Sequence, residues 1–171
     1  NNVCEKRYLG LVEKFGLTFV EAAGQKTIHD SEEMARSKLR SLPNGRWISR
    51  VYMTALNKRK GKAEPQQVVC TMSKQGEELH LDFSGTSPQL DNDHNSTLPS
   101  TKAHVGVALT NTLFWDVPWS DGKYVPVKLS VPEGSLLNCH YPAACGFAPW
   151  VGGMLVAAVC ENVGKMLFAA G

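Results

Sequence analysis

Apolar and polar residues alternate most clearly between Glu78 and Phe83. One side of this segment carries Leu79, Leu81 and Phe83, and the other carries Glu78, His80 and Asp82. This period of two predicts a strand with one buried face and one polar face. Segments 46–56 and 67–73 are rich in aromatic and β-branched residues and are predicted to be the two preceding strands. The short connection at 74–76 predicts an antiparallel hairpin between the second and third strands.

Apolar residues recur at helical spacing near the start of the chain. They are Tyr8, Leu11, Val12 and Phe15. The first predicted helix ends at Gly16, a residue suited to closing a helix. Thr18 and Glu21 have the spacing of a capping box, which predicts a second, half-exposed helix that reaches the breaker sequence 42–45. A break of this helix near Gly24 is an open alternative.

A long polar loop is predicted from Ser84 to Ser100, because small and polar residues replace the strand pattern there. The elements expected after it are a helix with Pro99 in its first turn, a turn at 115–122, a strand at 124–131, a turn at 132–135 and a helix from about Pro149. The most apolar stretch, 151–160, contains two glycines and is too short to span a bilayer. We expect a buried helix that packs closely through these small residues.

These elements predict an α+β fold in which an antiparallel β-sheet is flanked by helices. We expect one segment of a larger subunit, with a helical part at 1–45, hairpin strands and a polar loop at 46–98, and a helix, a strand and an apolar terminal helix at 99–171. The chain starts without Met and with no secretory leader pattern, and we expect an internal fragment.

Charge and cysteine content narrow the class of protein. Lys and Arg number 18 against 16 Asp and Glu, so no strong field favours nucleic acid, and no membrane partner is expected. The basic cluster of Lys58, Arg59, Lys60 and Lys62 is interpreted as a solvated turn. Five widely spaced cysteines, an odd number, suit reduced thiols in the cytoplasm.

Metal ligation is considered at Cys139, His140 and Cys145, since thiolate and imidazole are zinc ligands. Their spacing fits no common zinc site and a fourth ligand is missing. Metal binding there is left as the alternative, and the two cysteines are interpreted as small buried residues. The isolated His29, His80 and His104 are interpreted as structural.

The segment from Asp82 to Gln89 concentrates a carboxylate, three hydroxyls, a glycine and an amide where a strand ends. Such a turn can present N–H groups and hydroxyls to an anionic or carbonyl ligand. An ordinary strand-end turn, in which Asp, Ser and Thr cap their own backbone, is the alternative.

The string Asp-Phe-Ser-Gly-Thr-Ser-Pro-Gln at 82–89 resembles the signature of the hydantoinase B and oxoprolinase family. Three further landmarks of that family follow the same order: Leu-Pro-Asn-Gly at 42–45, an Asn-containing element at 92–95, and Val-Pro-Glu-Gly-Ser-Leu-Leu-Asn at 131–138 with Tyr-Pro-Ala-Ala at 141–144. The chain departs from the family at Asn92, where glycine is usual and positive φ is expected, at His94, where an apolar residue is usual, and at 139–141.

The resemblance implies a subunit of an ATP-dependent enzyme that hydrolyses a cyclic amide of the hydantoin, 5-oxoproline or lactam class through a phosphorylated intermediate. The alternative is the corresponding subunit of an acetone or acetophenone carboxylase. The resemblance further implies that the subunit forms a hetero-oligomer with a hydantoinase A type ATP-binding subunit. It also implies a small-molecule substrate. ATP and a divalent metal are expected outside this segment, which has no P-loop. The fragment is not expected to be active alone.

Within this resemblance, the residues expected to orient and hydrogen-bond the reacting groups are Asp82, Ser84, Thr86 and Asn95. Those expected to bind substrate are Gly85, Ser87, Gln89 and Asn138. A second hypothesis makes the region a docking scaffold, with the apolar terminal helix and the Trp115–Trp119 turn against the ATP-binding partner and the chemistry elsewhere.

Overall fold

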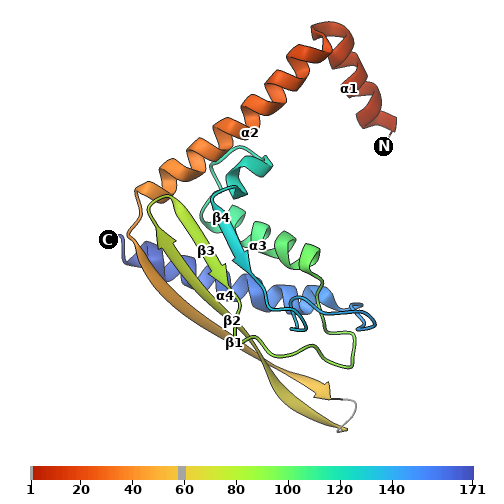
Figure 1. Ribbon diagram of the computed structural model, residues 1–171, viewed down its shortest axis with the longest axis vertical. Coiled ribbons are helices and arrows are strands. Elements are labelled where there is room, and N and C mark those ends of the chain that lie inside the picture. The colour runs from red at the N-terminus through yellow and green to blue at the C-terminus, as the bar shows by residue number, and fades with distance from the viewer. Residues whose placement is uncertain (1, 58–60) are drawn as a thin grey trace.

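The computed structural model describes residues 2–57 and 61–171 (Figure 1). The elements in chain order are α1 (Asn2–Phe15), α2 (Leu17–Arg40), β1 (Gly45–Asn57), β2 (Lys62–Gln75), β3 (Glu78–Asp82), α3 (Leu98–Thr112), the 3₁₀ helix η1 (Asp121–Tyr124), β4 (Val127–Ser130) and α4 (Ala148–Phe168). The predicted α+β class is confirmed. Lys58, Arg59 and Lys60, which we interpreted as part of a solvated turn, lie outside the described residues.

The four strands form one sheet in the order β1-β2-β3-β4. β1 pairs with β2 and β2 with β3 in antiparallel register, the second pair through the predicted hairpin. β3 and β4 pair in parallel, with Leu79 opposite Val127 and Asp82 opposite Ser130. The expectation of an antiparallel sheet is therefore wrong for its last pair, because α3 lies between these strands in the sequence and returns the chain to the same end of the sheet.

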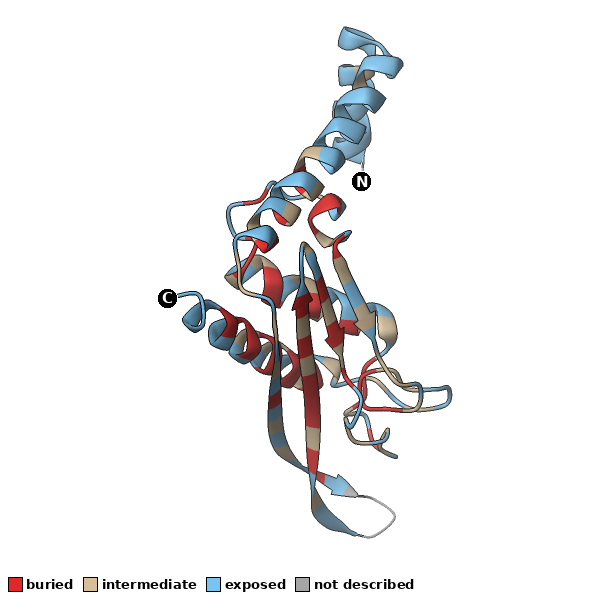
Figure 2. Ribbon diagram, turned by 60° about the vertical axis from the view of Figure 1, so that its left-hand side comes forward, coloured by how far each residue is buried: buried red, intermediate tan, exposed pale blue. Residues whose placement is uncertain are grey.

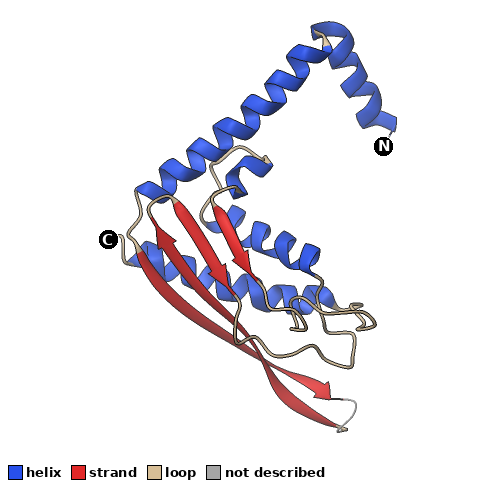
Figure 3. Cartoon of the chain, in the orientation of Figure 1, coloured by secondary structure: helices blue, strands red, loops and turns tan. Residues whose placement is uncertain are grey.

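The hydrophobic core lies between the sheet and α3 and α4, which cover one of its faces (Figure 3). The terminal helix α4 is long and apolar enough to cross a membrane, but half of its apolar window is buried in the fold against β1, β2 and α3. Close packing is confirmed at Gly152, since an added Cβ there would lie 2.2 Å from Nε2 of His104 on α3, but not at Gly153, where an added Cβ would meet nothing within 4 Å.

One buried amide ties α4 to two strands. Oδ1 of Asn162 accepts a hydrogen bond from Oγ of Ser49 at 2.6 Å, and its Nδ2 donates to the carbonyl of Cys70 at 2.9 Å. Asn162 is fully buried, so these bonds replace the water that its amide loses on folding. These two hydrogen bonds fix the position of α4 relative to β1 and β2.

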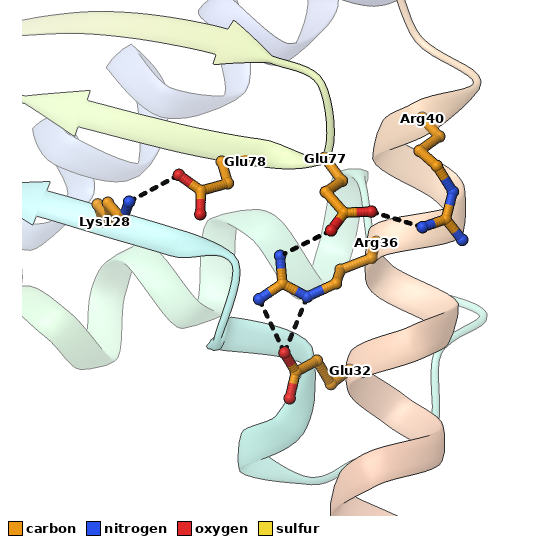
Figure 4. Close-up of polar contacts among 6 residues, drawn as sticks. All are labelled: Glu32, Arg36, Arg40, Glu77, Glu78 and Lys128. Carbon is orange, nitrogen blue, oxygen red and sulfur yellow. Dashed lines mark hydrogen bonds and ion pairs between the residues drawn. The ribbon is translucent and has the colours of Figure 1, made fainter.

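Helix α2 is attached to the β2–β3 hairpin by ion pairs (Figure 4). Arg36 pairs with Glu32 on its own helix at 2.8 Å and with Glu77 in the hairpin turn at 3.4 Å. Arg40 pairs with the other oxygen of Glu77 at 2.5 Å, so one carboxylate holds two guanidinium groups of α2.

The amino-terminal helices project from this body (Figure 1). α1 has no buried residue, and α2 buries only Ser31, Ala35 and Leu39, all in its second half. Figure 2 shows the outer part of this helical projection as mostly exposed. Gly16, at φ +82°, separates the two helices as predicted. The predicted capping box is wrong, because Gly16 itself is the N-cap of α2 and no side chain caps it. A break near Gly24 is also absent from α2, which is continuous.

Candidate functional site

The parallel pairing of β3 and β4 brings three of the four sequence landmarks together. Both strands run toward the same end of the sheet, so the loops 83–97 and 131–147 that follow them lie side by side (Figure 1). We call these two segments the loop cluster. The N–H of Leu136 donates to the carbonyl of Ser87 at 3.0 Å, and the N–H of Gln89 donates to the carbonyl of Gly134 at 2.8 Å. The landmarks at 82–89, 92–95 and 131–144 therefore form one structural unit.

The fourth landmark, 42–45, lies at the other end of the sheet. Its Asn44 accepts two hydrogen bonds through Oδ1, from the N–H of Gly76 at 2.9 Å and from Nζ of Lys74 at 3.1 Å. Lys74 is buried, and burial lowers the pKa of its ammonium group. This landmark holds the β2–β3 hairpin turn and does not contribute to the loop cluster.

Asp82 and Ser84 are the pair of predicted catalytic residues that the structure joins directly. Oδ1 of Asp82 accepts hydrogen bonds from the N–H of Ser84 at 2.9 Å and from its hydroxyl at 2.7 Å. Partial burial acts to raise the pKa of the Asp82 carboxyl, but these bonds and the charges of His80 and Arg46 hold that pKa below its usual value. Ser84 is exposed, so an ionised carboxylate and a hydroxyl lie near solvent at the start of the turn that follows β3.

Thr86 and Ser87 face the backbone of β2. Oγ1 of Thr86 accepts from the N–H of Val69 at 3.1 Å and donates to its carbonyl at 3.3 Å. Ser87 pairs with Gln67 in the same way, through its hydroxyl at 3.0 Å and its own N–H at 3.0 Å. β3 ends opposite Thr71, so these groups satisfy the part of β2 beyond the end of the ladder.

Gly85 and Gln89 are anchored within the same turn. Gly85 has φ +91°, which a residue with a side chain rarely adopts, and its carbonyl accepts a hydrogen bond from Nε2 of Gln67 at 2.9 Å. Oε1 of Gln89 accepts from the N–H of His140 at 2.7 Å, across the loop cluster. The carbonyl of Gly85 and Oε1 of Gln89 thus have partners within the protein.

Asn95 is fully buried and uses both ends of its amide. Oδ1 accepts from the N–H of Leu90 at 2.7 Å, and Nδ2 lies within hydrogen-bond distance of the carbonyls of Leu90, Asn92 and Ala144 at 3.0, 2.8 and 3.0 Å. A side-chain amide has two N–H groups, so these contacts use its full capacity as a donor. Asn95 joins loop 83–97 to loop 131–147 from inside.

Asn92 and Asn138 are also committed to backbone. Oδ1 of Asn92 accepts from the N–H of His94 at 2.9 Å, and its Nδ2 donates to the carbonyl of Leu56 on β1 at 2.9 Å. The expectation of positive φ at Asn92 is wrong: each described residue with positive φ is a glycine. Nδ2 of Asn138 donates to the carbonyl of Val131 at 3.3 Å, across the turn that follows β4.

Sequence reasoning gave His80 a structural role and did not name Ser130. The structure places both on the polar face near Asp82, with Nε2 of His80 2.8 Å from Oγ of Ser130 and Ser130 opposite Asp82 in register. The signal was present in the sequence, since a helix between two strands of one sheet indicates a parallel crossover.

Metal ligands do not gather in this region. Across residues 2–57 and 61–171, no three His, Cys, Asp or Glu side chains are placed to hold one ion. Cys139 and Cys145 lie close, with their sulfurs 3.2 Å apart, but His140 does not complete a group of three ligands with them.

A separate cavity of about 700 Å³ lies between α3, η1 and β4. Its lining is mostly apolar: Lys102, Ala103, Val105, Gly106, Val107, Trp119, Asp121, Tyr124, Val127 and Leu129. Trp119, which lines this cavity, is 80% exposed. Nζ of the buried Lys123 lies 4.2 Å from the centroid of the Trp119 ring. None of the eight residues proposed from the sequence lines this cavity.

Comparison with known proteins places the whole chain among related sequences. The hydantoinase B/oxoprolinase family model matches residues 1–170. The B subunit of a putative D-/L-hydantoinase from Pseudomonas sp. (strain NS671) is 29% identical over 147 residues, which cover 81% of this chain and 25% of that protein.

Two solved structures share the fold. The ATP-dependent caprolactamase from Pseudomonas jessenii superposes with a TM-score of 0.80 at 21% identity, over 96% of this chain and 28% of its own. A nucleotide-free acetone carboxylase superposes with a TM-score of 0.86 at 16% identity, over 97% of this chain and 23% of its own. The chain thus spans about a quarter of each of these proteins.

Proposed function

The chain belongs to the hydantoinase B/oxoprolinase family, and on that premise we propose that it is part of a subunit that hydrolyses a cyclic amide with ATP. The observation that carries this proposal is the family match over residues 1–170, together with the similarity to the Pseudomonas hydantoinase subunit. In the proposed reaction, ATP activates the amide oxygen by phosphorylation before water attacks the carbonyl carbon.

Within this function, Asp82 and Ser84 are the residues proposed to meet the reacting groups. They lie at the start of the turn that follows β3. The hydrogen bonds that lower the pKa of the Asp82 carboxyl use only its Oδ1. An ionised carboxylate with one oxygen outside those bonds is able to orient a water or a substrate N–H.

Thr86, Ser87 and Asn95 are proposed as positioning residues, because their hydroxyl and amide groups bind β2 or the loop backbone. Their role would be to keep the turn rigid while Asp82 and Ser84 meet the substrate. Gly85, Gln89 and Asn138 are proposed to shape the same substrate-facing surface through backbone geometry.

ATP and a divalent metal are proposed to bind outside this segment, on a hydantoinase A type partner or elsewhere in the complex. The relative from Pseudomonas is named as a subunit, which supports a hetero-oligomeric enzyme. No chemical step is assigned to a metal held by the residues described above.

The test is turnover by the complete complex. ATP hydrolysis is measured with hydantoin, 5-oxoproline and a lactam, and separately with acetone or an aryl ketone plus bicarbonate. Stimulation by a cyclic amide without bicarbonate is the expected result. Stimulation only by a ketone, with dependence on bicarbonate, would establish the carboxylase alternative, which the fold of acetone carboxylase makes the natural competitor.

The site assignment has its own test in that complex. Asp82→Asn can keep the oxygen that accepts both bonds from Ser84, and it replaces the second carboxylate oxygen with an uncharged NH2 donor, so we expect kcat to fall by about tenfold or more while assembly is unchanged. Ser41→Ala, at an exposed serine beyond the end of α2, is the matched control. Full turnover by Asp82→Asn would remove Asp82 from the site.

Docking is a second candidate function, favoured by the surface around the cavity of α3, η1 and β4. Trp115 and Trp119 are 72% and 80% exposed, and Nζ of Lys123 has no hydrogen-bond partner in the described part of the chain. Tryptophan is enriched in protein–protein interfaces, so these exposed tryptophans suit a partner surface. The terminal helix α4 does not join this surface through its apolar face, which is buried in the core.

We propose the ATP-binding partner subunit as the occupant of this surface. A photo-crosslinking residue placed at position 119 should capture that partner, whereas one placed at Tyr141, which is 97% exposed on the loop cluster, should not. Capture from position 141 alone would place the interface at the loop cluster instead.

A further inference from the structure

Two thiols lie side by side in the loop that follows β4. Sγ of Cys139 and Sγ of Cys145 are 3.2 Å apart, and both residues are half-buried free cysteines. A sulfur–sulfur bond measures about 2.0 Å, so the sulfurs would need to approach by only about 1 Å.

A small oxidant can reach this pair from solvent. The residues between the two cysteines are mostly exposed, and Tyr141 is 97% exposed. Cys70 differs in this respect, since it is fully buried and burial raises the pKa of its thiol to about 12. Accessibility therefore favours oxidation at the pair over oxidation at Cys70.

We propose that Cys139 and Cys145 are a site of reversible oxidation, at which hydrogen peroxide converts the two thiols into an intramolecular disulfide. In the first step the Cys145 thiolate attacks one peroxide oxygen, the O–O bond breaks, and the released hydroxide takes up a proton to become water. Cys145 is then a sulfenic acid. In the second step the Cys139 sulfur attacks the Cys145 sulfur, the S–O bond breaks, and a second water leaves with the Cys139 proton. Two thiols lose two electrons and one peroxide gains them.

The electrostatics of the pair support this order of steps. Burial raises the pKa of the Cys139 thiol to about 11, and its hydrogen bond to Cys145 and the charge of the Cys145 thiolate contribute in the same direction. Cys139 is therefore assigned as the second sulfur, which gives up its proton as it attacks the Cys145 sulfenic acid.

The disulfide would connect two anchored parts of the loop cluster. The N–H of Cys139 donates to the carbonyl of Ser96 at 3.1 Å, and the carbonyl of Ala144, next to Cys145, accepts from Asn95 at 3.0 Å. Oxidation thus restrains the segment that covers Asn95. This proposal concerns the thiols alone and does not depend on which reaction the enzyme catalyses.

Peptide mapping of the full-length protein in its complex tests the proposal. After a peroxide pulse, free thiols are alkylated and the protein is digested with chymotrypsin without reductant. Cleavage at Leu137 and Phe147 gives one peptide that holds both cysteines and excludes Cys160. Before oxidation this peptide should take two alkyl groups. After oxidation it should take none, lose the mass of two hydrogen atoms, and regain both alkylation sites on treatment with dithiothreitol.

Single variants separate the two steps. Cys139→Ser should stop at a Cys145 sulfenic acid, which dimedone traps once, and Cys145→Ser should leave Cys139 alkylated after the same pulse. Cys160→Ser, a half-buried cysteine on α4, is the matched control and should behave as the wild type. The proposal is overturned if the oxidised wild-type peptide still takes two alkyl groups, carries added oxygen on both sulfurs, or is linked to another cysteine.

Discussion

Replacing Asn95 with alanine should loosen the loop cluster selectively. The change removes one bond to the N–H of Leu90 and the contacts of Nδ2 with three carbonyls. Ala144 is exposed, so water can replace its lost bond, whereas Leu90 and Asn92 are more enclosed. With about 1 kcal/mol for each bond that water does not replace, the cost is about 2–3 kcal/mol.

Hydrogen exchange measured by mass spectrometry on the full-length protein is the suitable assay, because it reports the opening of one segment separately from the rest of the protein. A loss of about 2–3 kcal/mol corresponds to about 30- to 150-fold faster exchange at the amides of the loop cluster. The N–H groups of Ser96 and Phe147, which bond within the cluster, should report it.

The control is Asn111→Ala, which removes an amide from an exposed position on α3 and should leave exchange in the cluster unchanged. Exchange in Asn95→Ala within about twofold of the wild type would refute the reasoning, since four contacts cannot be lost at a buried residue at so small a cost. Faster exchange spread evenly over β1, β2 and α4 would refute the claim that the effect is local.

Three further substitutions test the packing and the charge of the fold. Gly122→Ala should detach η1 from α2 at a cost of about 1–3 kcal/mol or more, because its Cβ would lie 1.9 Å from the carbonyl oxygen of Ile28; faster proteolysis of α2 reports this. Gly152→Ala should lower the melting temperature through its clash with the histidine ring on α3, whereas Gly153→Ala, with nothing within 4 Å of its added Cβ, should not. The pKa of Asp82 is lowered on folding, so its contribution to stability is present above the unfolded pKa and is lost as pH falls through the folded one; Asp82→Asn should flatten that acidic loss when urea unfolding is followed against pH, and an unchanged pH dependence would contradict the assignment.

Alternation of side chains predicted the strands well because burial follows it. Leu79 and Leu81 are fully buried while His80 and Asp82 are partly exposed, as a period of two requires. Alternation carries no information on the direction of the neighbouring strand, and that is why the sheet was expected to be antiparallel throughout. β4 is four residues long, and its pairing is set by α3 and not by its own sequence.

The sequence predicted which residues belong to the candidate site but not how they are arranged in space. The resemblance located the turn 82–89 and Asn95, yet the sequence could not show that Thr86 and Ser87 complete the hydrogen bonding of β2. That assignment requires knowing where β3 ends relative to β2, which is a matter of register. For the same reason, Ser130 became visible beside Asp82 only when the parallel ladder was known.

The parallel pair also has a consequence for the order of folding. Leu79 lies opposite Val127, with the loop 83–97 and α3 between them in the sequence, so this ladder closes a long stretch of chain, unlike the local β2–β3 hairpin. Contacts that span such separations are costly in chain entropy and tend to form after local ones. The loop cluster is therefore expected to assemble late, and variants within it should chiefly accelerate unfolding while leaving the folding rate nearly unchanged.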